Sequence, residues 1–272
     1  MRTAQRGDGV QTGKMVVRGI VLRQTETKET DKILTVLTPH LGRIPVIARG
    51  ARRKNSRLAA ASQLLAYSEL TLFQKGNWYF LDEASTLELF DGVRRDLIML
   101  SLASYFAELT ESVTEEGQDA SEIVPLLLNA LYALGTLHKD PQLVKTAYEL
   151  RLLSLSGFEP LCDACAVCGR PEPEKPMLDV MRGVVHCSAC KEKGGLSLPL
   201  TRGALAALRH ILNCPPKRLY SFTIPMQELA LLAHASEAFV AAQLERSFRT
   251  LDYYKTVALD ENVPESTQEG SK

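Results

Sequence analysis

The sequence predicts a multidomain α+β protein: a five-stranded barrel followed by an α-helical domain with an inserted four-cysteine metal-binding module. Short β-branched runs separated by turn residues fill the first third of the chain, and a helical period of apolar residues follows. Two Cys-x-x-Cys pairs interrupt the helical part. We expect the domains at residues 14–92 and 93–259, with the insertion at 159–196, and disordered ends at 1–13 and 260–272.

Five strands are expected in the first domain. Turn residues separate them, and Gly76 in Gln74–Asn77 suits a hairpin turn. The strands are Met15–Leu22, Lys32–Thr38, Gly42–Ala48, Leu70–Phe73 and Trp78–Leu81. Because so many short strands follow one another with little helix between them, they predict a closed barrel, and the OB-fold is the commonest such architecture.

Helices are expected after residue 92, where apolar residues recur with a period near 3.6. Asp140 followed by Pro141 is typical of a helix start, and Gly157 of a stop. The expected helices cover Leu97–Val113, Ser121–Leu134, Pro141–Ser156, Thr201–Leu212 and, as one long helix, Pro225–Tyr254.

The two cysteine pairs have the spacing of a structural zinc site. Cys165 and Cys168 are followed after eighteen residues by Cys187 and Cys190, so four thiolates can bind one Zn²⁺ ion and leave no open position for a substrate. Paired disulfides or free core cysteines are the alternatives.

The neighbours of these pairs are expected to be bystanders. Cys162 also has Cys-x-x-Cys spacing from Cys165, but it follows an apolar residue. His186 is expected to be a solvated histidine, and Cys214 a small buried residue. A redox enzyme that uses Cys162 and Cys165 as a dithiol pair is another function that these cysteines allow.

Composition indicates a cytoplasmic protein with two differently charged parts. No signal-like segment is evident, and no run reaches the ~18 apolar residues of a membrane span, so no membrane partner is expected. The net charge is zero, but residues 1–92 contain fourteen Lys or Arg against nine Asp or Glu, and residues 93–272 contain eighteen against twenty-three. The basic part is the one expected to meet a polyanion.

The basic loop after the third strand is the candidate nucleic-acid site. Its five cations lie within nine residues with no acidic neighbour among them: Arg49, Arg52, Arg53, Lys54 and Arg57. Guanidinium groups bind phosphate through two hydrogen bonds, although most charge runs are only solvated loops. Trp78 and Tyr79, with Tyr67 and Phe73 nearby, are the candidates for base stacking, but most of these aromatic residues are expected inside the barrel.

No catalytic motif is present. The chain lacks a phosphate-binding Walker loop, GxGxxG, HExxH and GxSxG, so the sequence indicates a binding protein and not an enzyme.

The order of these parts resembles the bacterial RecO family of recombination mediators. The motifs that carry the resemblance span residues ~14–255: Glu29–Thr35, Thr38–Arg43, Ala48–Arg53 with Ser56 and Arg57, Gly157–Pro160, Cys165–Gly169 and Leu244–Thr250. The resemblance implies an OB-fold domain joined to a zinc-bearing helical domain, with the family's basic segment and cysteine pairs at the residues named above.

It also implies a non-enzymatic role in recombinational DNA repair. Proteins of this family bind single- and double-stranded DNA, anneal complementary strands, associate with RecR, and engage the C-terminal tail of single-stranded-DNA-binding protein to help RecA load. The resemblance implies that the protein is cytoplasmic and associates with the nucleoid. The alternative is a zinc-ribbon scaffold protein that binds RNA or an acidic protein.

The acidic, Phe-ended tail needs a pocket with apolar walls and cations. One hypothesis places it on the helices near Leu127, Leu131, Leu134 and Leu143, with Lys139 and Lys145 as the cations. The competing interpretation is that this leucine face is the core of the helical bundle.

Overall fold

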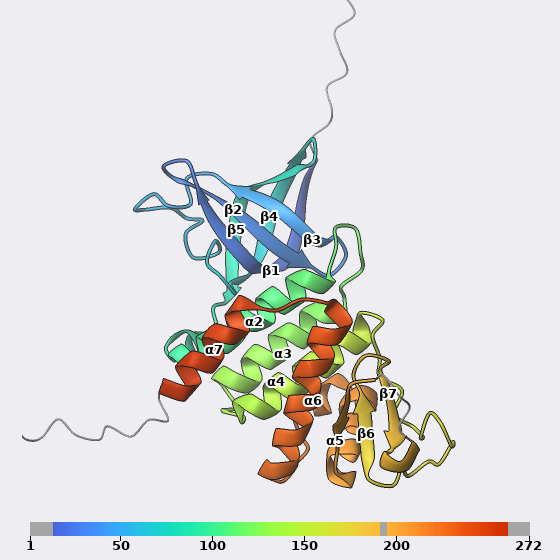
Figure 1. Cartoon of the computed structure of the whole chain (residues 1–272). Helices are drawn as coiled ribbons and strands as arrows, with labels where there is room; N and C mark the ends of the chain where they lie inside the picture. The colour runs from blue at the N-terminus through green and yellow to red at the C-terminus, as the bar shows by residue number, and fades with distance from the viewer. Residues whose placement is uncertain (1–12, 191–194, 261–272) are drawn as a thin grey trace, which may run out of the picture. The chain divides into compact units, whose positions relative to one another are not determined.

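The computed structural model describes residues 13–190 and 195–260 (Figure 1). The chain forms two compact units, one of Met1–Leu89 with Glu115–Asp119 and the other of Phe90–Thr114 with Ala120–Lys272. We call them the barrel unit and the helical unit. The ends expected to be disordered, 1–13 and 260–272, lie almost entirely outside the described residues.

The barrel unit is a closed five-stranded barrel with the strand order β1-β2-β3-β5-β4, which confirms the predicted OB-fold architecture. Neighbouring strands are antiparallel except β3 and β5, which pair in parallel through Val46–Tyr79 and Ile47–Phe80. The strands are β1 (Lys14–Thr27), β2 (Asp31–Thr38), β3 (Gly42–Ala48), β4 (Tyr67–Lys75) and β5 (Trp78–Glu88).

Alternation along the strands produces the barrel core. In β3, Ile44, Val46 and Ala48 are fully buried while the residues between them are half-buried. β1 and β5 are longer than predicted because their polar halves continue to pair through the backbone; Arg23–Thr27, for example, pairs with Asp31–Thr35. Backbone pairing needs no apolar side chain, so an apolar pattern misses such extensions.

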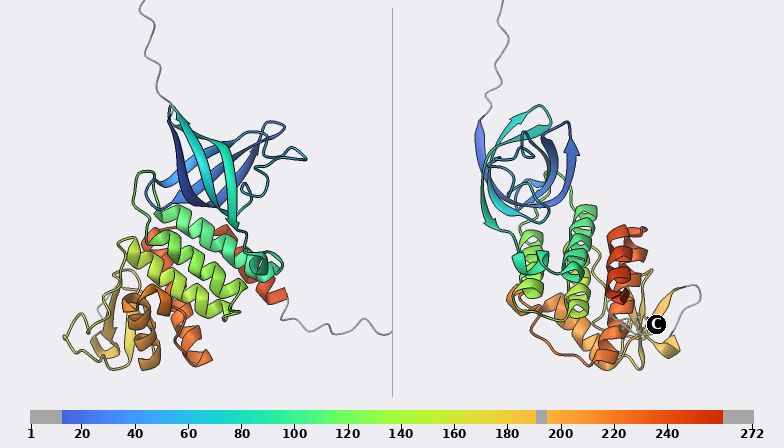
Figure 2. Two further views of the ribbon diagram at one scale, coloured as in Figure 1. Left: turned by 180° about the vertical axis from the view of Figure 1, so that it is seen from behind. Right: turned by 90° about the vertical axis from the view of Figure 1, so that its left-hand side faces the viewer.

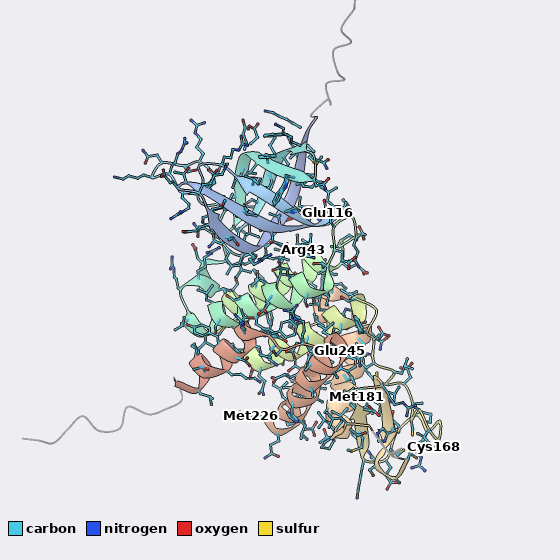
Figure 3. All side chains as sticks on the ribbon, turned by 45° about the horizontal axis from the view of Figure 1, so that its top comes forward. Arg43, Glu116, Cys168, Met181, Met226 and Glu245 are labelled. Atoms are coloured by element: carbon cyan, nitrogen blue, oxygen red, sulfur yellow. The ribbon has the colours of Figure 1, made fainter. Side chains whose placement is uncertain are left out.

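The Glu115–Asp119 segment completes the barrel unit beside the start of β3, where Figure 3 labels Arg43 and Glu116. The backbone N–H of Arg43 donates to the carbonyl of Glu115 at 3.0 Å, and Gly42 forms a β-bridge with Glu116. Gly42 has a φ of +64°, and a Cβ there would lie 2.1 Å from the Glu115 carbonyl oxygen. This position therefore requires glycine.

The helical unit contains α1 (Asp91–Arg94), α2 (Leu97–Val113), α3 (Ile123–Gly135), α4 (Pro141–Leu155), α5 (Arg202–Asn213), α6 (Met226–Leu244) and α7 (Arg249–Asp260), with 3-10 turns at Ser188–Cys190 (η1) and Pro216–Arg218 (η2). Figure 2 shows α2, α3 and α4 side by side. The predicted start of α4 has its cap: the Asp140 carboxylate accepts hydrogen bonds from the backbone N–H groups of Gln142 and Leu143.

The single long helix expected over Pro225–Tyr254 is wrong. Glu245 adopts a left-handed conformation (φ 50°) and ends α6, and the chain becomes helical again at Arg249. The break lets Phe248 bury its ring edge-on against Tyr105, with 5.6 Å between the ring centroids, so that α7 packs on α2. No Gly or Pro marks the break.

The insertion expected at 159–196 supplies two strands, β6 and β7, of a small three-stranded antiparallel sheet, β7-β6-β8, in agreement with its lack of helical period. The third strand, β8, lies just beyond the expected end of the insertion. The strands of the sheet are β6 (Pro176–Asp179), β7 (Val184–Cys187) and β8 (Ser197–Pro199). Leu178, Val180 and Val185 are fully buried, and Gln243 of α6 donates to the Val180 carbonyl at 2.8 Å. The sheet therefore buries apolar residues and is hydrogen-bonded to α6.

Candidate nucleic-acid interface and metal centre

The basic loop leaves β3 at Arg49 and runs through a series of hydrogen-bonded turns. It is attached to the β1–β2 turn at two points: the Gly50 N–H donates to the Asp31 carboxylate at 2.8 Å, and the Arg52 N–H donates to the Thr30 carbonyl at 2.9 Å. The hydrogen bond from Gly50 lowers the pKa of Asp31, so this carboxylate stays ionised at neutral pH. The anchored backbone holds the cations together.

The structure divides the five predicted cations into three groups. The local sequence suggested that Arg52 has no acidic neighbour, but it has one. Its guanidinium lies 2.9 Å from the Glu26 carboxylate of β1 and donates to the Glu29 carbonyl. Arg53, Lys54 and Arg57 are exposed and form no ion pair within the described part of the chain. Glu26 lies in β1, far from the loop in sequence, so this pairing has no sequence signal.

Arg49 has a different contact. Its guanidinium lies over the ring of Phe80, 4.8 Å from the centroid, and Phe80 stacks on Phe73 with 5.2 Å between centroids. The expectation that most of these aromatic residues fill the barrel is correct for Tyr79, which belongs to the core, but Trp78 is 42% exposed.

The four predicted cysteines come together. The Sγ atoms of Cys165, Cys168, Cys187 and Cys190 all lie within 4.8 Å of one another, and Cys168 and Cys187 are separated by 3.9 Å. Tetrahedral Zn²⁺ with Zn–S bonds of ~2.3 Å places its sulfurs about 3.8 Å apart, so the cluster fits such an ion. Figure 3 labels Cys168 on the exposed loop of the insertion.

Backbone N–H groups around the cluster favour the thiolate of Cys165, whereas the hydrogen bond with the Cys168 thiol raises the pKa of Cys190. Cys165 Sγ accepts from the N–H groups of Cys168 (3.5 Å) and Cys187 (3.4 Å), and Cys187 Sγ accepts from the Glu174 N–H (3.4 Å). Burial raises the pKa of Cys165, but these N–H groups outweigh it and lower the value to about 6. Gly169, with a φ of +71°, lets the backbone turn directly after the first pair.

Cys162 stays outside the cluster. It is buried, and its carbonyl accepts from Arg209 Nε of α5 at 2.9 Å. Burial raises the pKa of its thiol to about 11, so it is protonated at neutral pH and is a poor nucleophile or ligand. Cys214 is buried as expected. The prediction for His186 is wrong: the ring is buried, and its nitrogens contact the Cys187 carbonyl (2.8 Å) and the Ser197 hydroxyl (2.9 Å).

Comparison with known proteins covers both units. The family model described as "Recombination protein O N terminal" matches residues 14–90, and "Recombination protein O C terminal" matches residues 94–252. The chain belongs to the RecO family.

Curated members of the RecO family align along most of this chain. The DNA repair protein RecO of Acetivibrio thermocellus is 33% identical over 239 residues, 88% of this chain and 95% of that protein. The RecO proteins of Symbiobacterium thermophilum and a Thermoanaerobacter species are each 31% identical over 86–89% of this chain and 94–96% of their own length. This RecO-family chain is therefore a DNA repair protein.

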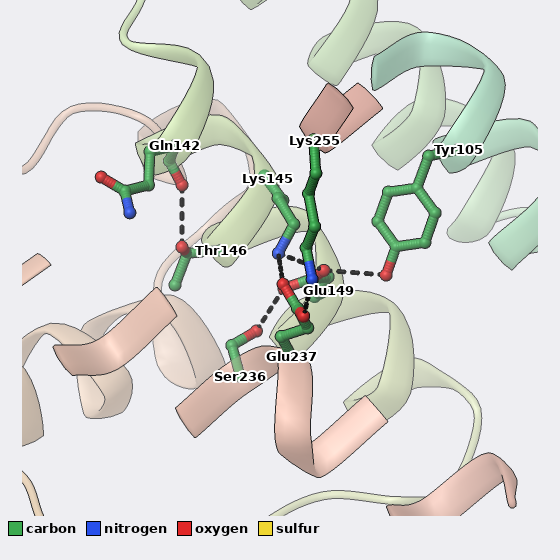
Figure 4. Close-up of polar contacts among 8 residues, drawn as sticks. All are labelled: Tyr105, Gln142, Lys145, Thr146, Glu149, Ser236, Glu237 and Lys255. Carbon is green, nitrogen blue, oxygen red and sulfur yellow. Dashed lines mark hydrogen bonds and ion pairs between the residues drawn. The ribbon is translucent and has the colours of Figure 1, made fainter. Parts of the chain in front are cut away.

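The leucine face suggested as a pocket is core in this RecO-family protein. Leu127, Leu131 and Leu134 are fully buried. Lys145 is also buried, and its ammonium lies 2.8 Å from the Glu149 carboxylate and 3.3 Å from that of Glu237 (Figure 4). A lysine held between two carboxylates has no charge to offer an acidic peptide, so the hypothesis is wrong for Lys145 and for these three leucines. Leu143 and Lys139 are half-buried, and their part of the hypothesis stays a prediction.

None of the described helices meets the length and hydropathy of a membrane span.

Proposed function

We propose that this chain is a non-enzymatic recombination mediator that binds single- and double-stranded DNA and anneals complementary strands. With RecR and the C-terminal tail of single-stranded-DNA-binding protein, it promotes RecA loading, as a cytoplasmic, nucleoid-associated protein. The observation that carries the proposal is the anchored loop of the OB-fold barrel, on which Arg53, Lys54 and Arg57 are exposed without acidic partners among the described residues. The names of the curated relatives support the role in DNA repair.

The mechanism is charge screening. Exposed cations on one loop attract the phosphates of two strands, reduce their mutual repulsion and leave the base edges free to pair. Since Arg53, Lys54 and Arg57 have no competing carboxylate among the described residues, they exchange only water and counterions for phosphate. Arg52 must also leave Glu26, so we assign it a smaller contribution.

The four cysteines would hold one structural Zn²⁺ ion, because all four sulfurs converge. Together they would fill the four coordination positions of the ion, so no position would remain for a substrate. When bound, the ion supplies folding free energy to the insertion. The DNA-binding residues proposed above belong to the other unit of the chain.

Charge reversal on the basic loop tests the proposal. We expect Arg53→Glu with Arg57→Glu to weaken binding of a fluorescent single-stranded oligonucleotide and to slow annealing. The slope of log K against log salt should become shallower by about 0.7 for each phosphate that the loop no longer engages. Arg52→Glu is a less direct test, since it would place two carboxylates together at Glu26.

The matched control is Lys217→Glu with Arg218→Glu, two exposed cations on η2 of the helical unit. This variant should bind and anneal as the unchanged protein does. Equal affinity of the Arg53/Arg57 variant would exclude the loop as the DNA site. RNA binding without DNA binding would favour the scaffold alternative.

A further inference from the structure

The outer face of the β4–β5 hairpin bears a row of aromatic and cationic side chains that phosphate binding does not explain. Tyr79 and Leu81 point into the barrel core, so alternation sends Trp78 and Phe80 to the outside. Across the hairpin Phe73 pairs with Phe80, and Lys75 pairs with Trp78. Paired residues of an antiparallel ladder share a face, so these four side chains form one row.

The two ends of this row differ in exposure. Phe80 is only 9% exposed although it is not a member of the barrel's core cluster, because Phe73 stacks on it (interplanar angle 12°) and the Arg49 guanidinium lies above it. Trp78 is 42% exposed. Phe80 is therefore already covered, whereas the Trp78 ring is available to a ligand.

Arg49 connects this row with the basic loop, because it is the loop's first cation and contacts Phe80, two residues from Trp78 on the same strand. Single exposed aromatic residues are common on protein surfaces and need no ligand. Here the exposed ring lies beside Lys75, and the same strand meets the first cation of the basic loop where Arg49 covers Phe80. Aromatic and cationic side chains together are the combination that single-strand binding surfaces use. A strand whose phosphates follow the cations would bring its bases to the hairpin.

We propose that Trp78 is a stacking platform for an unpaired base of single-stranded DNA bound along the basic loop. The inference rests on the proposed function, and it adds a preference for single-stranded over double-stranded DNA. Phosphate contacts bind single and double strands alike, whereas the faces of bases in a duplex are covered by their neighbours. The Trp78 ring therefore favours single strands.

Trp78 is the only tryptophan of the chain, so its fluorescence reports this site alone. Titration of the full chain with oligo(dT) should quench the emission. An abasic oligonucleotide of equal length, which offers sugar and phosphate without bases, should bind without quenching, and so should a blunt duplex. Equal quenching by the abasic strand would overturn the proposal, because it would report the approach of phosphate and not stacking.

Substitution of the ring gives an independent measurement. Trp78→Ala should weaken oligo(dT) binding about 5- to 150-fold, the range that one stacked base contributes, while affinity for the abasic strand and the duplex stays unchanged. Trp78→Phe should retain most of the affinity, which excludes misfolding as the cause. Tyr253→Ala removes an exposed ring from the helical unit and is expected to have no effect.

The result separates this inference from the proposed function. If oligo(dT) binds with the expected salt dependence but Trp78→Ala binds equally well, stacking is refuted and the phosphate site stands. If the unchanged protein binds no oligonucleotide even at low salt, both proposals are refuted.

Discussion

Glu149 of α4 is a buried charged residue of the helical unit with partners on three helices. It is fully buried, and its carboxylate accepts from the Tyr105 hydroxyl (2.8 Å), the Ser236 hydroxyl (2.6 Å) and Lys145 Nζ (2.8 Å), as Figure 4 shows. These partners come from α2, α6 and α4 itself. Burial lowers the pKa of Lys145, but the carboxylates of Glu149 and Glu237 outweigh it and raise the value above normal, so this lysine stays charged.

Removal of Lys145 should be strongly destabilising. Lys145→Met leaves the Glu149 carboxylate buried without its cation, and we expect a loss of ~3–5 kcal/mol in the free energy of unfolding, measured by urea denaturation. The control is Arg170→Met, which breaks an exposed i,i+4 pair with Glu174 and should cost about 0–1 kcal/mol. Similar values for the two variants would contradict a structural role for the buried pair.

A helix end offers a second test, at the scale of one element. Asp140 is exposed, and its carboxylate accepts from two N–H groups at the start of α4, so Asp140→Ala should lower the free energy of unfolding by about 0.5–2 kcal/mol. Glu122 occupies the same position before α3 without a side-chain cap, so Glu122→Ala should change stability by less than about 0.5 kcal/mol. Thermal unfolding of both variants distinguishes a cap from a general charge effect.

Features encoded locally could be predicted from the sequence. The strands, the Asp140–Pro141 helix start and the convergence of four cysteines depend on alternation, capping and spacing within short segments. Features that depend on distant residues could not. The Glu26 partner of Arg52, the burial of His186 beside Ser197 and the break at Glu245 arise from packing that brings separate segments together.

The same limit explains the error about Lys145. A lysine near a leucine face suggests a charged rim, but Glu149 one turn later and Glu237, ninety-two residues away, enclose the ammonium. The i,i+4 spacing of Lys145 and Glu149 is visible in the sequence, but their burial is not. The tertiary neighbours of a cation therefore decide whether its charge is available to a ligand. The same reason makes Arg52, which pairs with Glu26, differ from the exposed Arg53.

At the scale of the whole molecule, the division into two units predicts that metal removal and DNA binding are separable. The cysteine cluster belongs to the helical unit, while the basic loop and Trp78 belong to the barrel unit. Circular dichroism at the helical band follows mainly the helical unit, and Trp78 fluorescence follows the barrel alone. Two probes can therefore follow the unfolding of the two units in one sample.

We expect Cys165→Ser with Cys187→Ser, or a strong zinc chelator, to lower the midpoint of the circular-dichroism transition, by about 2–4 °C for each kcal/mol of metal-derived stability removed. The Trp78 transition and the affinity for oligo(dT) should change little, because none of the proposed DNA-binding residues lies on the insertion. Chelator added to the double-serine variant is the control and should have no further effect. Equal shifts of both transitions would show that the units unfold as one, whereas loss of oligo(dT) affinity at a temperature where both remain folded would place part of the DNA site on the insertion.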